Sequence, residues 1–339
     1  MYLIYYIKKF DNDKFSLFLN HAATETGQSK LILMFEAITS VFIYNVSILE
    51  YFQFRFFEKS KSERKKWAGS GYMYEYQRIM NPSKARIILN DKTLFYKEYR
   101  NFMRHKVSDI SDLENDPLIA EDILGNSAGK IVFKVADGKC GANVLIRRSA
   151  DFDKNTISYF MKKEGYDLVE EYIIQHPVLM KLSPTAVNTV RIFTQLDARD
   201  EVEILGCRLR ISVNSSVDNM AAGNMAAPID ELTGIITGPA VYSDIAKTDE
   251  IVHPVTGVPI TGFQVAFWKE TVDMIKIAAK LHPQNRSVGW DIAITEKGPD
   301  LIEGNHDWCK LVWQLPVKKG LKPILEKHLS EYKRHRRGD

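Results

Sequence analysis

Hydrophobic and polar residues follow different patterns in different parts of the chain. Residues 1–108 lack the alternation of a strand and are rich in aromatic and long side chains, so they are predicted to be mostly helical. Further along, two short β-branched runs at 131–135 and 143–147 flank the glycine-containing stretch DGKCGA. This order predicts a strand, a glycine loop and a second strand. A predicted helix over 152–163 and a strand over 168–174 complete a small unit of mixed structure.

The C-terminal part alternates longer strands with helices. Residues 186–196 and 201–212 are predicted to form an antiparallel hairpin. Residues 288–295 and 300–305 are predicted to form a second strand pair, joined by the turn EKGP. Apolar residues at helical spacing predict a helix over 263–281 between the two pairs.

These patterns indicate an α+β fold class and a division into three parts. Residues 1–108 would form a mostly helical N-terminal region, residues 109–175 a small unit, and residues 176–339 a large unit. The length supports such a division, because 339 residues exceed what one ordinary hydrophobic core holds.

Composition and charge exclude some classes of protein. The 46 Lys and Arg residues nearly balance the 43 Asp and Glu residues, so the chain lacks the basic excess of a nucleic-acid-binding protein. The chain has only three cysteines, and an odd, sparse set argues against a disulfide framework and favours a reducing compartment. Because no signal peptide is visible either, we expect a cytoplasmic protein that does not bind nucleic acid.

One apolar stretch, residues 31–57, could be mistaken for a membrane span. Glu36, Asn45 and Glu50 interrupt it, so no run reaches the ~18–20 apolar residues that a spanning helix needs. One or two buried helices are the simpler interpretation. The basic run at 59–66 could contact anionic lipid, although such runs more often face solvent. Membrane contact is therefore expected to be peripheral at most.

The last predicted strand pair carries candidate metal ligands. Asp291 lies in VGWDIAIT, and Glu303 and Asn305 lie in LIEGN. In a hairpin Asp291 and Glu303 come from neighbouring strands, while Glu303 and Asn305, two residues apart, share a face. Three oxygen ligands on one side of a sheet suit Mg²⁺. Glu303 and Asn305 could instead stabilise a turn, but a carboxylate on an apolar strand is costly to bury unless it is paired or bound to a metal.

The glycine loop is a candidate phosphate site. Gly138 and Gly141 would let backbone amides approach phosphate oxygens, and Lys134 just before the loop would supply a positive charge. The loop is not a Walker A motif, because it lacks the GK[ST] ending and a strand follows it. Many hairpins have glycine in the turn, so this signal alone is weak.

Three further groups complete the candidate site. The segment 168–174 joins the two units, and Glu170 or Glu171 could accept a hydrogen bond from an adenine amine or a ribose hydroxyl. Arginines on the predicted hairpin could bind an anion, or could form ordinary salt bridges on the surface of the sheet. They are Arg191, Arg208 and Arg210. The loop VDNMAAGNMAAP, which contains Asn219, could close over a ligand.

The order of these features resembles the ATP-grasp family, in which two α+β units clasp ATP. This resemblance implies that ATP and Mg²⁺ are bound. The corresponding positions are Lys92 and Lys134 for the phosphates, Gly138 and Gly141 for a flexible lid, Glu170, Glu171 and Ile173 for the hinge that holds adenine, and Asp291, Glu303 and Asn305 for magnesium. Arg191, Arg208 and Asn219 resemble the arginine and asparagine positions of the amide-forming members.

More narrowly, the chain looks like the sugar-transfer-associated ATP-grasp proteins, which are usually encoded among capsule and exopolysaccharide genes. The matching stretches include LNDKTLFYKEY, VNTVRIF, VDNMAAGNMAAPID and VGWDIAITEKGPDLIEGNHDW, all between residues 89 and 308. The resemblance implies a ligase that activates a sugar carboxylate, such as a uronic acid, as an acyl phosphate and joins it to an amino acid or another amine. Two alternatives remain, an ATP-grasp sugar kinase and a nucleotide-binding regulator of a glycosyltransferase without catalytic activity.

Overall fold

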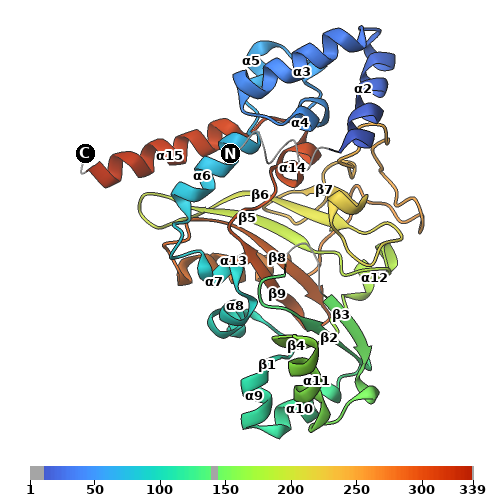
Figure 1. Ribbon diagram of the computed structural model, residues 1–339, viewed down its shortest axis with the longest axis vertical. Helices are drawn as coiled ribbons and strands as arrows, with labels where there is room; N and C mark the ends of the chain where they lie inside the picture. The colour runs from blue at the N-terminus through green and yellow to red at the C-terminus, as the bar shows by residue number, and fades with distance from the viewer. Residues whose placement is uncertain (1–10, 139–143, 338–339) are drawn as a thin grey trace.

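The computed structural model describes residues 11–138 and 144–337, arranged along one long axis (Figure 1). Helices from the N-terminal region form one end, a large sheet lies in the middle, and a small sheet with its own helices forms the other end. The predicted α+β class, with a mostly helical N-terminal region, is confirmed. No helix among the described residues is long and apolar enough to cross a membrane.

The large sheet has five antiparallel strands in the order β7-β6-β5-β8-β9. They are β5 (Val190–Leu196), β6 (Val202–Ile211), β7 (Met225–Ile229), β8 (Ser287–Thr295) and β9 (Gly298–Asn305). Both predicted strand pairs are therefore present. Every residue of β5 is buried, because helices cover the sheet on both faces. The polar residues of β5, Arg191, Thr194 and Gln195, are buried with the apolar ones and make hydrogen bonds inside the protein.

One face of the large sheet is covered by α13 (Trp268–Leu281), whose buried side is apolar at helical spacing. The predicted helix over 263–281 begins later than expected, because Phe267 at its start has a left-handed backbone. The remaining elements of this part are α12 (Pro177–Leu182), η4 (Met220–Ala222), α14 (Lys310–Gln314), η5 (Leu315–Val317) and α15 (Lys322–Arg337).

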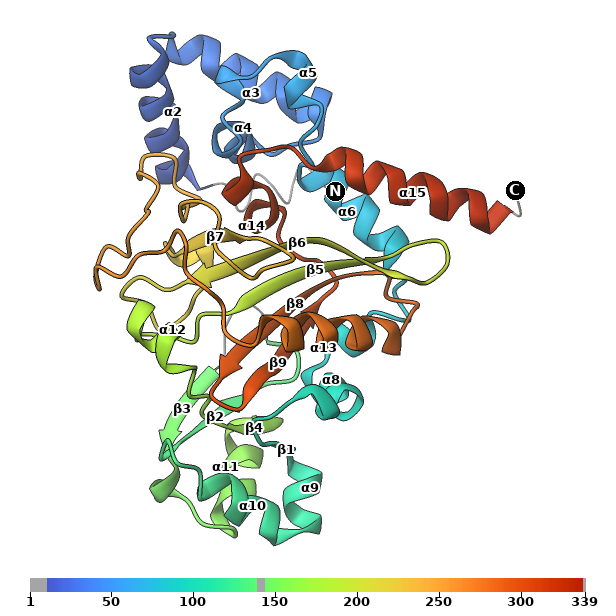
Figure 2. The same cartoon turned by 180° about the vertical axis from the view of Figure 1, so that it is seen from behind.

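The other face is covered by the N-terminal helices together with α14 (Figures 1 and 2). These helices are α2 (Asn12–Thr26), α3 (Lys30–Tyr44), α4 (Ile48–Gln53), η1 (Phe56–Glu58), α5 (Lys61–Arg64) and α6 (Ser70–Met80). Ser47 and Ser60 start α4 and α5 with a capping box, in which the serine and a glutamate three residues later satisfy each other's backbone amides. The chain then continues through α7 (Ile87–Asn90), α8 (Lys92–Tyr99) and η2 (Arg100–Phe102) toward the small sheet.

The small sheet has four strands in the order β1-β4-β2-β3, all antiparallel. Its elements are β1 (Val107–Asp109), α9 (Ile110–Asn115), α10 (Pro117–Leu124), β2 (Lys130–Lys134), β3 (Val144–Arg148), η3 (Ser149–Asp151), α11 (Thr156–Glu164) and β4 (Leu168–Glu171). The sequence did not predict β1, which is too short to show alternation. Strand β4 ends at Glu171, earlier than the predicted 174, because its pairing with β2 stops there.

Candidate active site

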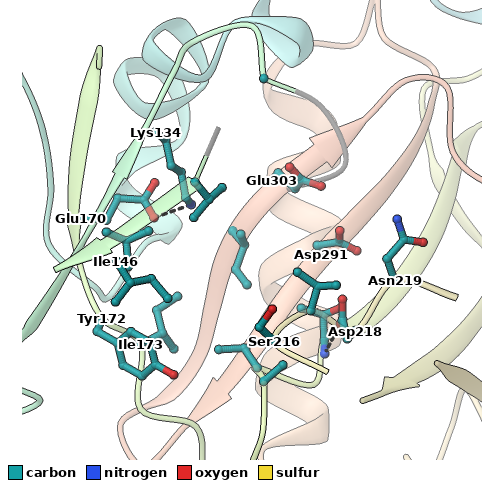
Figure 3. Close-up of a pocket in the computed structure, with 18 of the residues that line it drawn as sticks. Lys134, Ile146, Glu170, Tyr172, Ile173, Ser216, Asp218, Asn219, Asp291 and Glu303 are labelled. Atoms are coloured by element: carbon teal, nitrogen blue, oxygen red, sulfur yellow. Dashed lines mark hydrogen bonds and ion pairs between the residues drawn. The ribbon is translucent and has the colours of Figure 1, made fainter. Parts of the chain in front are cut away.

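A cavity of about 280 Å³ lies between the small sheet and the edge of the large sheet, where β8 and β9 face β2 and β4 (Figure 3). The predicted positions that line it are Lys92, Lys134, Gly138, Glu170, Glu171, Ile173, Asn219, Asp291 and Glu303. Segments from five separate parts of the chain thus meet at one site. Gly141 and Cys140 lie outside the described residues.

Strand β2 directs a positive charge into the cavity. Ile131 and Phe133 are buried in the core of the small unit, so Val132 and Lys134, which alternate with them, face the other way and line the cavity. The Lys134 ammonium lies 2.5 Å from the Glu170 carboxylate on β4, as Figure 3 shows. The lysine is therefore paired with a protein carboxylate in this structure.

Lys92 approaches the same space from the start of α8. Its backbone amide donates to the carbonyl of Ala136 at 3.0 Å, and its ammonium donates to the carbonyl of Gly138. These bonds join the helix to the chain that follows β2. Burial lowers the pKa of the Lys92 ammonium, an effect that the Glu303 carboxylate opposes. Two lysines from different elements thus face one cavity.

The end of the cavity next to the linker after β4 has an apolar lining. Glu171 is the last paired residue of β4, and Tyr172 and Ile173 follow it along the linker. Apolar side chains from both sheets and from neighbouring loops surround the same space, and they are Val132, Val144, Ile146, Ala186, Val187, Val217 and Ile302. A slot of this kind, beside a strand end with polar groups, suits a flat heterocyclic ring.

The opposite wall is built around Asp291 on β8. Arg191, its neighbour on β5, makes a two-pronged ion pair with it, in which Nη2 donates to Oδ2 at 2.6 Å and Nε donates to Oδ1. Arg210 on β6 also donates to Oδ2, at 3.0 Å. Burial alone would raise the pKa of the Asp291 carboxyl, but the two guanidinium groups outweigh it and lower that pKa to about 2. Asp291 is therefore firmly ionised.

Glu303 lies directly across from Asp291 in the β8–β9 hairpin. Burial and the nearby Asp291 carboxylate raise the pKa of Glu303. Asn305, two residues on, donates its amide to Glu303 Oε1 at 3.1 Å. Two adjacent carboxyls that resist simultaneous ionisation, beside an amide, are a donor set that suits a divalent cation such as Mg²⁺. Among the described residues no group of three or more His, Cys, Asp or Glu side chains forms a metal cluster, so this candidate site has only two carboxylates.

Arg210 and Asp218 extend this charged wall. The sequence indicated Arg210 as one of three arginines that could bind an anion, whereas it gave no reason to select Asp218. Arg210 Nη2 lies 2.7 Å from Asp218 Oδ1, and Thr189 donates both its amide, at 2.9 Å, and its hydroxyl to Asp218 Oδ2. Both charged residues line the cavity. Arg208 and Arg210 lie two residues apart, so their alternation along β6 did not distinguish between them.

Arg208 is the predicted site residue that the structure places elsewhere. Its Nε and Nη2 donate to the carbonyl of Trp313, at 3.1 Å and 2.5 Å, and it lines neither of the cavities described here. Burial lowers the pKa of Arg208 to about 10, although the nearby Glu231 carboxylate opposes this effect. Arg208 points away from the cavity because the C-terminal end of α14 packs over this part of β6. The last turn of a helix has carbonyl groups without partners inside the helix, and the Trp313 carbonyl accepts from Arg208. Arg210 occupies the position beside Asp291 instead.

A second cavity, of about 550 Å³, opens from the first one toward the N-terminal helices. The two cavities share residues of the charged wall and of the lid, which are Lys92, Lys134, Gly138, Glu170, Arg210, Asn219, Ile302 and Glu303. Arg191 and Asn305 line only the second cavity. Because the cavities meet at Glu303 and the lysines, molecules bound in each would touch at this point.

The far wall of the second cavity comes from the N-terminal helices. Glu50 of α4 is buried there and accepts hydrogen bonds from Ser47, Ser70 and Lys310, at 2.5–2.9 Å. This carboxylate joins α4, α6 and α14 into one wall. Lys14, Leu49 and Gln53 line the rest of that side. The N-terminal region is therefore part of the site and not only a cover for the sheet.

His105, which the sequence gave no reason to select, links the two sheets below the cavity. Its Nδ1 lies 2.7 Å from Asp300 Oδ1 on β9, and its Nε2 lies 3.7 Å from Glu170 Oε2 on β4. Glu170 in turn holds Lys134. Burial opposes protonation of His105, but the carboxylates of Asp300 and Glu170 outweigh it and raise its pKa.

Comparison with known proteins gives one match that covers most of the chain. A family model described as sugar-transfer associated ATP-grasp matches residues 72–329. No curated protein matches significantly.

Solved structures of three ATP-grasp enzymes resemble the fold at low identity. The ATP-grasp ligase PsnB with its precursor peptide PsnA2 and AMPPNP is 14% identical over 75% of this chain and 63% of its own, with a TM-score of 0.44. Biotin carboxylase from Campylobacter jejuni is 13% identical over 75% of this chain and 49% of its own, with a TM-score of 0.48. D-alanine–D-alanine ligase from Bacillus anthracis is 15% identical over 74% of this chain and 69% of its own, with a TM-score of 0.41.

These structural similarities carry no argument about activity, and the chain spans less than two thirds of the PsnB length. The family model, in contrast, covers both sheets and all the predicted site residues. The chain therefore belongs to the sugar-transfer associated ATP-grasp family.

Proposed function

We propose that the protein is an ATP-dependent carboxylate–amine ligase that works through an acyl phosphate. The observation that carries this proposal is the pair of adjoining cavities, which meet where two lysines face Glu303. ATP would occupy the smaller cavity, with adenine in the apolar slot beside Ile173 and the phosphates beside Lys92 and Lys134. A carboxylate substrate would occupy the larger one.

Asp291, Glu303 and Asn305 would hold magnesium, which neutralises phosphate charge when it is bound. The protein's own residues would do the positioning. Lys134 would leave Glu170 for a phosphate oxygen, and Lys92 would leave the carbonyl of Gly138 for another. An ammonium is a stronger donor to an ionised oxygen than to a neutral carbonyl, so the exchange at Lys92 favours the nucleotide. At Lys134 a phosphate oxygen would replace the carboxylate oxygen of Glu170.

The lining of the larger cavity supports a polar substrate. Hydroxyl and amide side chains from several elements face this space, and they include Ser47, Gln53, Asn90, Ser243 and Asn305. Such a lining suits the hydroxyl groups of a sugar, and the cationic side chains at the junction suit its carboxylate. We therefore propose a sugar carboxylate, such as a uronic acid, as one substrate and an amino acid or another amine as the other. A role in making surface polysaccharide, which the resemblance to the sugar-transfer-associated proteins implies, is part of the proposal.

The reaction would proceed in two steps. A carboxylate oxygen attacks the γ-phosphorus, the bond to ADP breaks, and an acyl phosphate forms. The amine then attacks the acyl carbon, the C–N bond forms, and phosphate leaves with loss of a proton from the nitrogen. Arg210, which faces both cavities, would stabilise the oxyanion that develops on the acyl carbon, and Arg191 would hold Asp291 in place.

The test is to incubate the protein with Mg-ATP, a panel of uronic acids and a panel of amino acids and amines, and to measure ADP and free phosphate. The proposal predicts that both appear only when a carboxylate and an amine are present together. ADP without free phosphate, accompanied by a phosphorylated sugar, would show a kinase instead. Nucleotide binding without turnover under any pairing would favour a regulator of a glycosyltransferase.

A further inference from the structure

Helix α3 is apolar on two opposite faces. One face is buried and packs on the N-terminal core through Leu33, Ala37 and Tyr44. The opposite face lies in solvent and carries Leu31, Phe35, Ile38 and Phe42 in a single stripe, with Ile32 and Ile43 beside it. The spacing of four, three and four residues keeps the stripe on one side of the helix.

The exposure of this stripe is large for side chains of this kind. Leu31, Phe35 and Phe42 are 71%, 69% and 70% exposed, and Ile43 is 64% exposed. Six large apolar side chains on this side of the helix form a patch. Large exposed apolar patches mark sites that bind another protein or a membrane. This α3 stripe lies at the end of the molecule farthest from the small sheet (Figures 1 and 2).

Basic residues lie next to the α3 stripe. Helix α5 is fixed beside α3 by an ion pair between Arg64 and Glu36, with an Nη2–Oε2 distance of 2.9 Å. That pair also neutralises the one acidic residue of α3. Lys61, Lys65 and Lys66 are exposed on and after α5, and residues 59–66 contain five basic residues and one glutamate. The end of the molecule thus combines an apolar stripe with a positive border.

We propose that the α3 stripe and the basic residues of α5 dock the protein onto the surface of an anionic lipid bilayer. An interfacial helix buries its apolar face at the boundary between headgroups and acyl chains, and nearby lysines bind anionic headgroups. A second copy of the chain fits less well. In a two-fold dimer across this surface each basic border would meet its own copy, and like charges would repel.

Docking in this way would orient the molecule. The N-terminal helices that carry the α3 stripe also wall the larger cavity, through α4 and the start of α6. The larger cavity, and not the small sheet, would therefore lie on the membrane side, where a substrate carried by a lipid could enter. The docking surface does not depend on the ligase chemistry, so either proposal can fail alone.

The experiment is flotation of the full-length protein, without nucleotide, with vesicles of phosphatidylcholine alone and with vesicles that also contain phosphatidylglycerol. We expect binding to the anionic vesicles that weakens as salt is raised. The double variant Phe35→Ser and Phe42→Ser should bind at least roughly tenfold more weakly. Reversing the charge of Lys61, Lys65 and Lys66 to Glu should weaken binding to anionic vesicles by at least roughly fivefold per lysine and remove the salt dependence.

The matched control is Leu232→Ser, which removes a side chain that is 90% exposed on a loop of the large unit. It should leave vesicle binding unchanged, and all variants should melt like the wild type because the altered side chains are exposed. The proposal is overturned if the wild type binds neither kind of vesicle or if Leu232→Ser weakens binding as much as the double variant. It is also overturned if sedimentation velocity shows a dimer that the Phe35 and Phe42 changes abolish, since a second copy would then cover the stripe.

Discussion

The two walls of the ATP-grasp cavity are built in different ways. On the large-sheet side, Asp291 and Arg191 are buried on their strands and Asp218 is buried in the loop after β6. These three residues and the partly buried Arg210 hold one another through ion pairs. On the small sheet, in contrast, strand β3 is largely exposed, and Lys134 of β2 makes an ion pair with Glu170. One wall is therefore assembled with the core of the protein, whereas the other presents cations that must change partners when a nucleotide binds.

Because of this difference, substitutions in the two walls should affect different properties, the stability of the fold and the affinity for nucleotide. Substitutions in the large-sheet wall leave charges buried without partners, so they should cost folding free energy as well as activity. Substitutions of the lysines on the other wall should cost nucleotide affinity while the fold persists. A catalytic site with one rigid wall and one adjustable wall can hold the reacting groups in place and still admit and release its ligands.

The largest effect is expected for Asp291→Asn. This change removes the carboxylate shared by Arg191 and Arg210, and we expect the free energy of unfolding to fall by about 3–5 kcal/mol. Urea denaturation of both proteins measures the difference. A loss below about 1 kcal/mol would show that the wall is not part of the stabilising core.

Glu303→Gln is the matched control on the neighbouring strand. Because burial and Asp291 already raise the pKa of Glu303, removal of its charge relieves repulsion, and stability should change by less than about 1 kcal/mol. ATP-dependent product formation should nevertheless fall below detection, since a proposed metal ligand is lost. The substitution of Asp291 should therefore reduce stability, whereas the substitution of Glu303 beside it should reduce activity alone.

Lys134→Met should mainly affect binding. The change removes one ammonium from the phosphate position, and we expect the Kd for ATP to rise roughly 10- to 100-fold with little change in melting temperature. Isothermal titration calorimetry measures the affinity. Lys154→Met, which breaks an exposed pair with Glu121 on the same small unit, should leave the Kd unchanged.

Arg208→Met should affect stability and leave ATP binding unchanged, which would distinguish Arg208 from Arg210. Arg208 donates to the carbonyl of Trp313 and lines neither cavity, so its loss should cost about 1–3 kcal/mol of stability without changing the Kd for ATP. Denaturation and calorimetry on the same sample measure both quantities. A large increase in the Kd for ATP would show that Arg208 contributes to the nucleotide site, as the family resemblance implied.

The smallest effect concerns pH and His105. Because the folded-state pKa of His105 is raised above its unfolded value of about 6.5, its contribution to stability is fully present below that value. The contribution is lost as the pH rises through the folded-state pKa. The wild type should therefore lose stability relative to His105→Gln as the pH is raised from about 6 to 8, and a constant difference would contradict the role given to Asp300 and Glu170.

Much of this arrangement could be predicted from the sequence. The apolar strands around Asp291 and Glu303 predicted that the two carboxylates come from neighbouring strands, and the short β-branched run before the glycine loop predicted the strand that carries Lys134. The choice between Arg208 and Arg210 could not be predicted, because both share a face of β6 and only the packing of α14 decides which one meets Asp291. His105 and Asp300 were missed for a related reason, since they meet only when the connector before β1 folds against β9. The exposed face of α3 was also missed, because an apolar stretch gives no indication of which side is covered.

The central claim, activation of a carboxylate at the junction of the two cavities, can be tested by the fate of one oxygen atom. Once the panel identifies a substrate pair, the carboxylate substrate is labelled with ¹⁸O in its carboxyl group, and the released phosphate is analysed by mass spectrometry. Attack of the carboxylate on the γ-phosphorus predicts that one ¹⁸O is transferred to each phosphate. Free phosphate without the label would show that no acyl phosphate forms, and would contradict the account.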